Sequence, residues 1–162
     1  MFKPKRLLVP VDFTDESSLA LDWAIMLAKN VPGASITLCH VLGQTITPVG
    51  PEAMVFDRFE NEKRMAEAKL QQWQQLIPAE VISNIMIVQG RHAPKIVDAA
   101  QKDRSDLILL TTHGRRGLSR MLRGSVSEEV VRESLCPVLV LHLTRSTVEA
   151  VHDAAKSERL PE

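Results

Sequence analysis

The sequence predicts a single α/β domain built on a five-stranded, mainly parallel sheet with helices on both faces. Two observations predict this class. Short apolar runs alternate with longer segments of helical periodicity over residues 1–143, and the run at 35–42 is mostly apolar on both faces, as in a doubly covered strand. The length of 162 residues and the hydrophobic content of 44% are sufficient for one core, so a second domain is not expected.

The first strand and the first helix are expected close to the N-terminus. Arg6 to Val11 is a short run rich in Leu and Val, and a polar turn follows in which Thr14 can cap a helix. The acidic residues after Thr14 suit a first helical turn. Pro32 and Gly33 end the pattern, whose apolar stripe consists of Ala20, Ala24, Leu27, Ala28 and Val31.

The second strand is expected at Ser35 to Leu42. Gly43 to Pro51 carries Gly, Thr and Pro without periodicity, so we expect a long loop there, which is a candidate lid. A long polar helix is expected from Glu52 to Ile77, ended by Pro78. Its apolar stripe consists of Ala66, Leu70, Trp73 and Ile77.

The second half of the chain continues the alternation. Strands are expected at Ile82 to Val88, Asp106 to Leu110 and Val138 to Leu143, with a helix at Val126 to Leu135. A further helix before the fourth strand is marked by Ala93, Ile96, Val97 and Ala100. Residues 144–162 form a polar tail, for which a weak helix and disorder both stay open.

The composition excludes several classes of function. Twenty basic and twenty acidic residues give a formal net charge of zero, so no global field recruits nucleic acid or an anionic membrane. No apolar stretch approaches the ~20 residues of a membrane span, and the first apolar run stops at Pro10, too early for a signal peptide. We expect a cytoplasmic protein. Cys39 and Cys136 lie far apart in strand-like surroundings, which favours small buried hydrophobes over a disulfide or a metal site.

The segment from Thr111 to Ser125 indicates a phosphate-binding loop. Its glycines free the backbone to approach a ligand, and Ser125 with Glu128 forms a capping box that opens a helix. Helix N-termini attract anions through their unpaired N–H groups and the macrodipole. Positive charge that suits a nucleoside triphosphate comes from Arg115, Arg116, Arg120 and Arg123. A flexible, solvated loop is the alternative interpretation.

The order of elements predicts where such a ligand would lie. Ligands of parallel sheets bind beyond the carboxyl ends of the strands. Asp12 ends the first strand, Val41 lies near the end of the second, and Thr111 ends the fourth. If the first strand lies beside the fourth, these residues share one crevice with the loop. Asp12 is alternatively a simple cap of the first helix.

Three motifs resemble the universal stress protein family. They are L-L-V-P-V-D-F-T in the first strand, C-H-V in the second, and T-H-G-R-R-G-L-S-R-M-L-R-G-S-V-S-E-E-V followed by C-P-V-L-V-L. The resemblance covers residues 3–143 and implies a strand order of 3-2-1-4-5, with the crevice between the first and fourth strands. Nucleotide-binding members share a pattern of Gly, two residues, Gly, nine residues, Gly and Ser or Thr. Here this pattern falls on Thr111, Gly114, Gly124 and Ser125, so Thr111 replaces its first glycine.

The resemblance also implies a ligand, ATP with Mg²⁺ carried by its phosphates, and the residues that bind it. Asp12 would be a hydrogen-bonding partner of the adenine, and Thr111 would lie against the ribose, where a β-branched side chain crowds or hydrogen-bonds the sugar. The implied site consists of Pro10, Asp12, Val41, Thr111, His113, Gly114, Arg115, Arg116, Gly117, Gly124, Ser125, Val126 and Ser127.

Structural roles are open for several of these residues. Ser125 is a good helix cap with or without a ligand. His113 has no Ser, Cys or carboxylate at a spacing that suggests a triad, so a structural role is favoured. His40, in the middle of the second strand, is expected to be a hydrogen-bonded core residue.

Three functions follow from these observations. The first is a regulatory module that binds ATP and passes its state to an unidentified protein partner. The second is a slow ATPase, which the absence of a G-x-x-x-x-G-K-[ST] motif and of a lysine in the loop disfavours. The third is a nucleotide-free scaffold. In each case the apolar edge strand Val138 to Leu143 predicts a homodimer. An edge strand without a charged residue or proline can pair with the same strand of a second copy.

Overall fold

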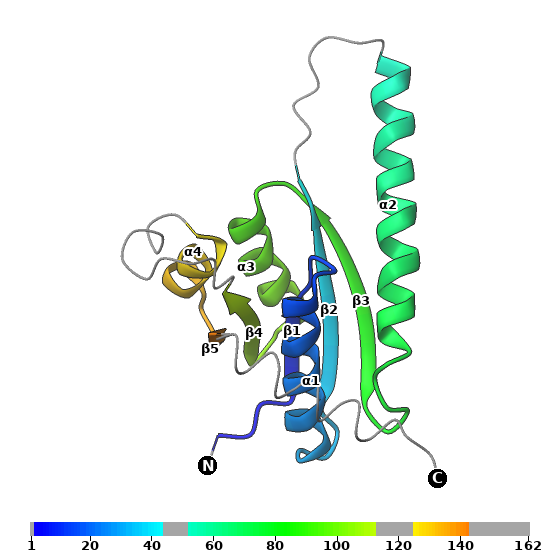
Figure 1. Ribbon diagram of the computed structural model, residues 1–162. Helices are drawn as coiled ribbons and strands as arrows, with labels where there is room; N and C mark the ends of the chain where they lie inside the picture. Colours follow the sequence, from blue (N-terminus) through cyan, green and yellow to red (C-terminus); the bar gives the residue numbers. More distant parts are fainter. Residues whose placement is uncertain (1, 44–51, 113–124, 143–162) are drawn as a thin grey trace.

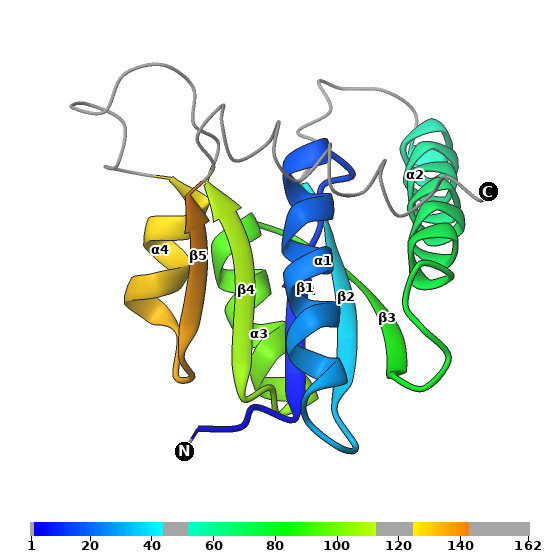
Figure 2. The ribbon, with the colours of Figure 1, turned by 60° about the horizontal axis from the view of Figure 1, so that its bottom comes forward.

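The computed structural model describes residues 2–43, 52–112 and 125–142. The elements alternate along the chain in the order β1 (Arg6–Pro10), α1 (Asp15–Lys29), β2 (Ser35–Leu42), α2 (Glu52–Gln74), β3 (Ile82–Gln89), α3 (His92–Asp103), β4 (Leu107–Thr112), α4 (Val126–Glu133) and β5 (Val138–His142). The strands form one sheet in the order β3-β2-β1-β4-β5, and its four neighbouring pairs are parallel, as Figure 2 shows. The predicted fold class and strand order are confirmed.

Helices cover both faces of this sheet, as predicted. On one face α1 packs over β1 and β4 while α2 packs over β2 and β3; α3 and α4 lie on the other face (Figures 1 and 2). The core therefore has two halves that share the sheet. The first half includes Leu7, Leu38 and Leu70, and the second includes Leu8, Ile108 and Val130, all fully buried.

The alternation of side chains along β2 follows the prediction. Ile36 and Leu38 belong to the core under α1 and α2, whereas Cys39 and Val41 belong to the core under α3. Because successive side chains of a strand point to opposite faces, a strand between two helical layers is apolar throughout. The apolar pattern at 35–42 thus has the expected cause.

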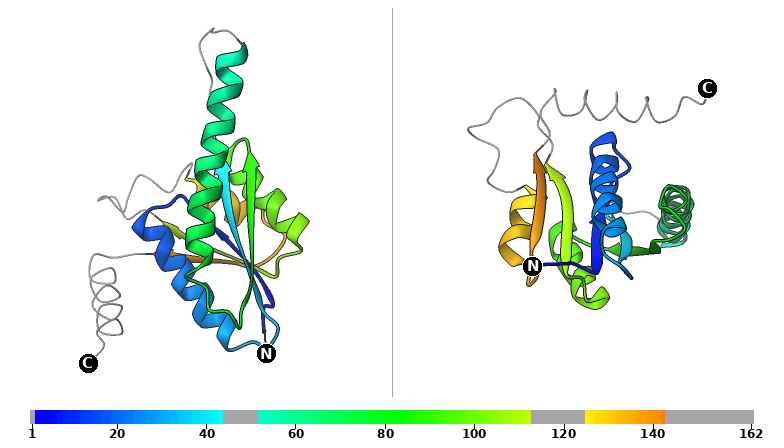
Figure 3. Two further views of the ribbon diagram at one scale, coloured as in Figure 1. Left: turned by 90° about the vertical axis from the view of Figure 1, so that its right-hand side faces the viewer. Right: turned by 90° about the horizontal axis from the view of Figure 1, so that it is seen from below.

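The helix α2 is the longest element and reaches beyond the sheet. Its N-terminal part extends past the carboxyl ends of β2 and β3 (Figures 1 and 3). The helix ends at Gln74, three residues before the predicted end, because Leu76 and Ile77 donate to the carbonyls three residues back, at 3.0 and 3.1 Å. Ile77 nevertheless completes the predicted stripe, since its side chain is buried.

Several other boundaries differ from the prediction by one or two residues. The strand β1 ends at Pro10 rather than Val11, and β3 ends at Gln89 rather than Val88. The helix α4 ends at Glu133 rather than Leu135, because Ser134 has an extended backbone and the side chain of Leu135 is 83% exposed. The strand β4 covers Leu107–Thr112, so it begins one residue after the predicted start at Asp106 and ends two residues beyond the predicted end at Leu110. The polar tail and most of the loop at 43–51 lie outside the described residues.

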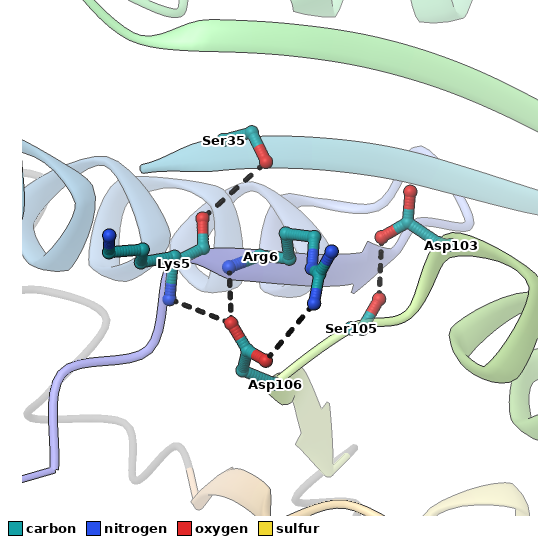
Figure 4. Close-up of polar contacts among 6 residues, drawn as sticks. All are labelled: Lys5, Arg6, Ser35, Asp103, Ser105 and Asp106. Carbon is teal, nitrogen blue, oxygen red and sulfur yellow. Dashed lines mark hydrogen bonds and ion pairs between the residues drawn. The ribbon is translucent and has the colours of Figure 1, made fainter. Parts of the chain in front are cut away.

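A polar network joins the amino ends of β1 and β4 (Figure 4). The Asp106 carboxylate accepts hydrogen bonds from the backbone N–H groups of Lys5 and Arg6, both at 3.0 Å, and lies 3.8 Å from the Arg6 guanidinium. Nearby, Asp103 accepts from Ser105 at 2.6 Å and from Thr37 at 2.9 Å. These contacts lie at the edge opposite the predicted ligand site, so we assign them to stability.

Candidate functional site

The site begins where β1 and β4 separate. The ladder between them joins Leu7 to Leu107 and Leu8 to Ile108, whereas β1 stays paired with β2 up to Pro10. In the same way β4 stays paired with β5 up to Thr112. The chain runs outward from β1 in one direction and from β4 in the other, so this position is the topological switch point where parallel sheets bind ligands.

The turn between β1 and α1 presents Asp12. Its side chain is exposed, and Oδ1 accepts hydrogen bonds from the Thr14 backbone N–H at 3.1 Å and the Thr14 hydroxyl at 2.5 Å. Thr14 is the N-cap of α1, and its Oγ1 accepts from the Ser17 N–H. The alternative that Asp12 caps this helix is therefore wrong. Its carboxylate orients the capping residue and stays at the surface of the turn.

Phe13, the next residue, has a backbone conformation that is unfavourable for a large side chain. Its φ is +63°, in the left-handed region. The Phe13 ring lies 4.5 Å from the His40 ring and 5.8 Å from the Trp73 ring, centroid to centroid, and the Lys69 Nζ lies 5.2 Å from its centroid. We call these four residues the aromatic cluster. They bring β1, β2 and α2 together beside Asp12.

His40 has the predicted hydrogen bond, although its side chain is half-buried rather than in the core. Its Nδ1 lies 2.7 Å from the Val11 carbonyl oxygen, and a carbonyl only accepts, so Nδ1 carries the proton. The roles of Phe13, Trp73 and Lys69 were not expected from the sequence. The role of Phe13 could have been suspected from the sequence, because it is a large aromatic residue in an otherwise polar turn directly after a strand.

An open hollow of about 310 Å³ lies beside this turn, between the end of β2 and the middle of α2. Its wall combines aromatic and apolar side chains with one cationic group, Lys69, and one acidic group, Glu62. The lining residues are Phe13, His40, Val41, Leu42, Gly43, Glu62, Met65, Ala66 and Lys69. Of the predicted site residues, Val41 is part of this wall.

The N-terminus of α4 forms the other side of the candidate site. Ser125 is the N-cap, as predicted, and its Oγ accepts from the Glu128 N–H at 3.2 Å and lies 3.1 Å from the Ser127 Oγ. Val126 and Ser127 begin the helix, where backbone N–H groups have no intrahelical partner. The acidic first turn opposes anion binding, and an ion pair of 2.8 Å between Arg91 and Glu129 offsets part of that charge.

Thr111 lies within β4 and is half-buried. The alternation along the strand puts it on the same face as Leu107 and Leu109, which is the face that α1 covers. Its neighbour Thr112 points to the other face, and its hydroxyl lies 3.1 Å from the His142 Nδ1. A β-branched residue therefore stands at the carboxyl end of β4, where the family pattern has a glycine.

The structure thus brings the described part of the predicted site to one edge of the sheet. Pro10 is the last residue of β1 and Asp12 lies in the turn after it. Val41 and Thr111 lie near the ends of β2 and β4, and the segment 125–127 opens α4. The remaining predicted residues lie outside the described residues, and they are His113, Gly114, Arg115, Arg116, Gly117 and Gly124.

Both cysteines are free thiols. Cys39 is buried, and Cys136 is half-buried against the same core. Burial raises the pKa of the Cys39 thiol from 9.0 to about 12, and the negative charge of Asp103 adds to this shift. Among the residues that the structure describes, no group of three or more His, Cys, Asp or Glu side chains is arranged to hold a metal ion. The interpretation of Cys39 as a small buried hydrophobe is confirmed.

Comparisons with known proteins agree with this architecture. The model of the universal stress protein family matches residues 3–142. The chain is 30% identical over 145 residues to universal stress protein MJ0531 of Methanocaldococcus jannaschii, which covers 85% of this chain and 81% of that protein. It is also 30% identical over 146 residues to universal stress protein YxiE of Bacillus subtilis, with coverages of 84% and 97%. The chain therefore belongs to the universal stress protein family.

Solved structures show the same fold. Universal stress protein UspA from Lactobacillus plantarum superimposes with a TM-score of 0.73 at 25% identity, over 87% of this chain and 99% of that one. The protein MJ0577 gives a TM-score of 0.70 at 26% identity, over 89% and 99%. A universal stress protein in complex with cAMP, at 21% identity and a TM-score of 0.65 over 87% and 98%, shares the fold as well.

Proposed function

We propose that this chain is a cytoplasmic regulatory module of the universal stress protein family that binds ATP and passes its nucleotide state to a protein partner. The observation that carries the proposal is that Asp12 follows β1 at the switch point between β1 and β4, while the N-terminus of α4 follows β4 along the chain. The comparison protein with bound cAMP, and a family member from Arabidopsis thaliana with AMP bound, support an adenine nucleotide as the class of ligand.

The residues at this edge have the chemistry that such a ligand needs. A carboxylate such as that of Asp12 can accept a hydrogen bond from an amino group of a base. The hydroxyls of Ser125 and Ser127 and the N–H groups that begin α4 can donate to phosphate oxygens. We expect Mg²⁺ to be coordinated mainly by the phosphates and by water. Among the described residues no group of three or more His, Cys, Asp or Glu side chains is arranged to coordinate it.

The proposed site has residues for each part of the nucleotide, which are the base, the ribose and the phosphates. Pro10, Asp12 and Val41 border the base, and Thr111 lies against the ribose. The phosphates lie against the loop and the start of α4, formed by His113, Gly114, Arg115, Arg116, Gly117, Gly124, Ser125, Val126 and Ser127.

A glycine substitution in the loop tests this proposal. Gly124→Val should abolish ATP binding in a calorimetric titration while the far-UV spectrum stays native, because a side chain there blocks the approach of the phosphates. Gly33→Ala is the control: it strains a backbone with φ +74° at the opposite edge of the sheet, so it should lower stability and leave affinity unchanged. Unchanged affinity in Gly124→Val would refute the site.

We also propose that the protein is a homodimer that pairs through β5. In the part of the chain that the structure describes, β5 pairs with β4 on one side. Its residues from Val138 to Leu141 are half-buried, and His142 is exposed. An apolar edge without a charge or proline that opposes pairing favours association with a second copy.

We do not propose catalytic turnover for this protein. ATP hydrolysis faster than about 1 per second would contradict a binding role.

A further inference from the structure

The turn that carries Asp12 contains a residue in an unfavourable backbone conformation, Phe13. Phe13 and Arg104 are the non-glycine residues with positive φ in the described segments. Arg104 is the C-cap of α3, where a left-handed residue is ordinary. Phe13 has no such role, because it precedes the N-cap of α1. A conformation of this kind persists when surrounding contacts over-determine it, and it is typical of functional sites.

The contacts that hold Phe13 come from two other elements. The His40 ring is tilted by 35° against the Phe13 ring, and the Trp73 ring meets it edge-on at 88°. Aromatic pairs at these centroid distances attract one another beyond the burial of area. The Lys69 ammonium over the same ring adds a cation–π contact. The ring is thus clamped between β2 and α2.

His40 acts on both sides of Asp12. Its Nδ1–H donates to the carbonyl of Val11, the residue before Asp12, and its ring packs against Phe13, the residue after it. Val11 itself is anchored, since its N–H donates to the Cys39 carbonyl at 2.8 Å. One side chain of β2 therefore restrains the backbone that flanks the carboxylate.

We propose that His40 and Phe13 are positioning residues, which hold the β1–α1 turn so that Asp12 is presented to the base of the nucleotide. This inference rests on the proposed function, because it assigns how the base-binding end of that site is preorganised. Preorganisation raises affinity by removing the cost of ordering the turn on binding.

The test compares ATP with inorganic tripolyphosphate, which has no base. His40→Phe keeps an aromatic ring and removes the Nδ1–H donor, whereas His40→Asn keeps an N–H donor near the same place. We expect His40→Phe to weaken ATP binding about tenfold and to leave tripolyphosphate binding unchanged. His40→Asn should restore part of the ATP affinity, because it supplies the donor but lacks the ring that packs against Phe13. Ile36→Val, a small core change on the same strand, is the control and should bind both ligands like the wild type.

A second measurement examines the turn without any ligand. The Thr14 amide N–H donates to the Asp12 carboxylate, so its hydrogen exchange reports the geometry of the turn. Exchange at Thr14 should become faster in His40→Phe and in Phe13→Leu than in Ile36→Val. Phe13→Leu keeps the position apolar and serves if the His40 variants do not fold.

The outcomes separate the two proposals. If the wild type binds neither ligand, the proposed function fails and the positioning role fails with it. If the wild type binds ATP while all variants bind it within about twofold, the nucleotide site stands and the positioning role is wrong. Equal losses for ATP and tripolyphosphate, or unchanged exchange at Thr14, also overturn the positioning role.

Discussion

Cys39 lies in the middle of β2 with its side chain fully buried under α3. The pKa of its thiol is raised from 9.0 to about 12, by burial first and by Asp103 second. A raised pKa means that folding favours the protonated thiol. Its contribution to stability is therefore complete below pH 9.0 and is lost as the pH rises towards about 12.

We therefore predict that ionisation of the Cys39 thiol lowers the stability of the fold at alkaline pH. Above pH 9 the wild type should lose up to about 1.4 kcal/mol of unfolding free energy per pH unit more than Cys39→Ala. Urea unfolding of both proteins at pH 8 and pH 10.5 checks this, and the absence of tyrosine removes one competing titration. Parallel stability curves for the two proteins would show that Cys39 does not titrate as described.

At the scale of single residues, the sequence predicted chemistry better than conformation. Thr14 and Ser125 were expected as caps because their side chains accept from nearby N–H groups, and both predictions are confirmed. The left-handed backbone of Phe13 could not be predicted, because contacts from β2 and α2 decide it. Local preference at that position favours the opposite sign of φ.

The capping of α4 is a property of an element and can be separated from ligand binding. Ser125→Ala should cost about 1 kcal/mol of unfolding free energy, whereas Ser125→Gly should cost only a few tenths, because glycine is a tolerable cap. If the hydroxyl also contacts phosphate, both variants should lose ATP affinity to a similar degree. Affinity that follows stability across the two variants would assign Ser125 to capping alone.

The start of β4 depends on the Asp106 network (Figure 4). Asp106→Ala leaves two backbone N–H groups without their carboxylate partner, so it should destabilise the fold by about 1–2 kcal/mol. Arg6→Ala is the matched control. It removes only an exposed ion pair at 3.8 Å and should cost below about 1 kcal/mol. Thermal unfolding compares them, and equal losses would mean that the ion pair, not the backbone contacts, stabilises this end.

Element positions were predictable where periodicity was clear. The bounds of β2 agree residue for residue, because a strand covered on both faces is apolar along its whole length. The ends of α2 and α4 were less predictable. Ile77 continues the apolar stripe although the helix has already ended at Gln74, so the pattern of burial outlasts the helical hydrogen bonds.

At the scale of the molecule, alternation of elements predicted a parallel sheet, but the strand order came from the family resemblance. The order puts Asp12 and the start of α4 at the switch point, which no local pattern reveals. The aromatic cluster was missed for the same reason, since it joins three elements that are distant in sequence. None of the described helices combines the length and the hydropathy that a membrane span requires.

The proposed dimer is also a property of the whole molecule. Light scattering after size-exclusion chromatography should give about twice the mass of one chain, 18.1 kDa, at micromolar concentration. Val140→Lys places a charge on the edge strand and should reduce the mass to that of a monomer, because edge charges oppose pairing. A wild type that is monomeric at this concentration would refute pairing through β5.

The central claim is that the carboxyl edge of the sheet binds an adenine nucleotide. Calorimetric titration of nucleotide-stripped protein with Mg-ATP tests it most directly, after mass spectrometry of any small molecule released on denaturation. We predict saturable binding at one site per chain. The absence of both a released nucleotide and a binding heat would contradict the claim and would favour a nucleotide-free scaffold, in which Thr111 has replaced the glycine that the ligand needs.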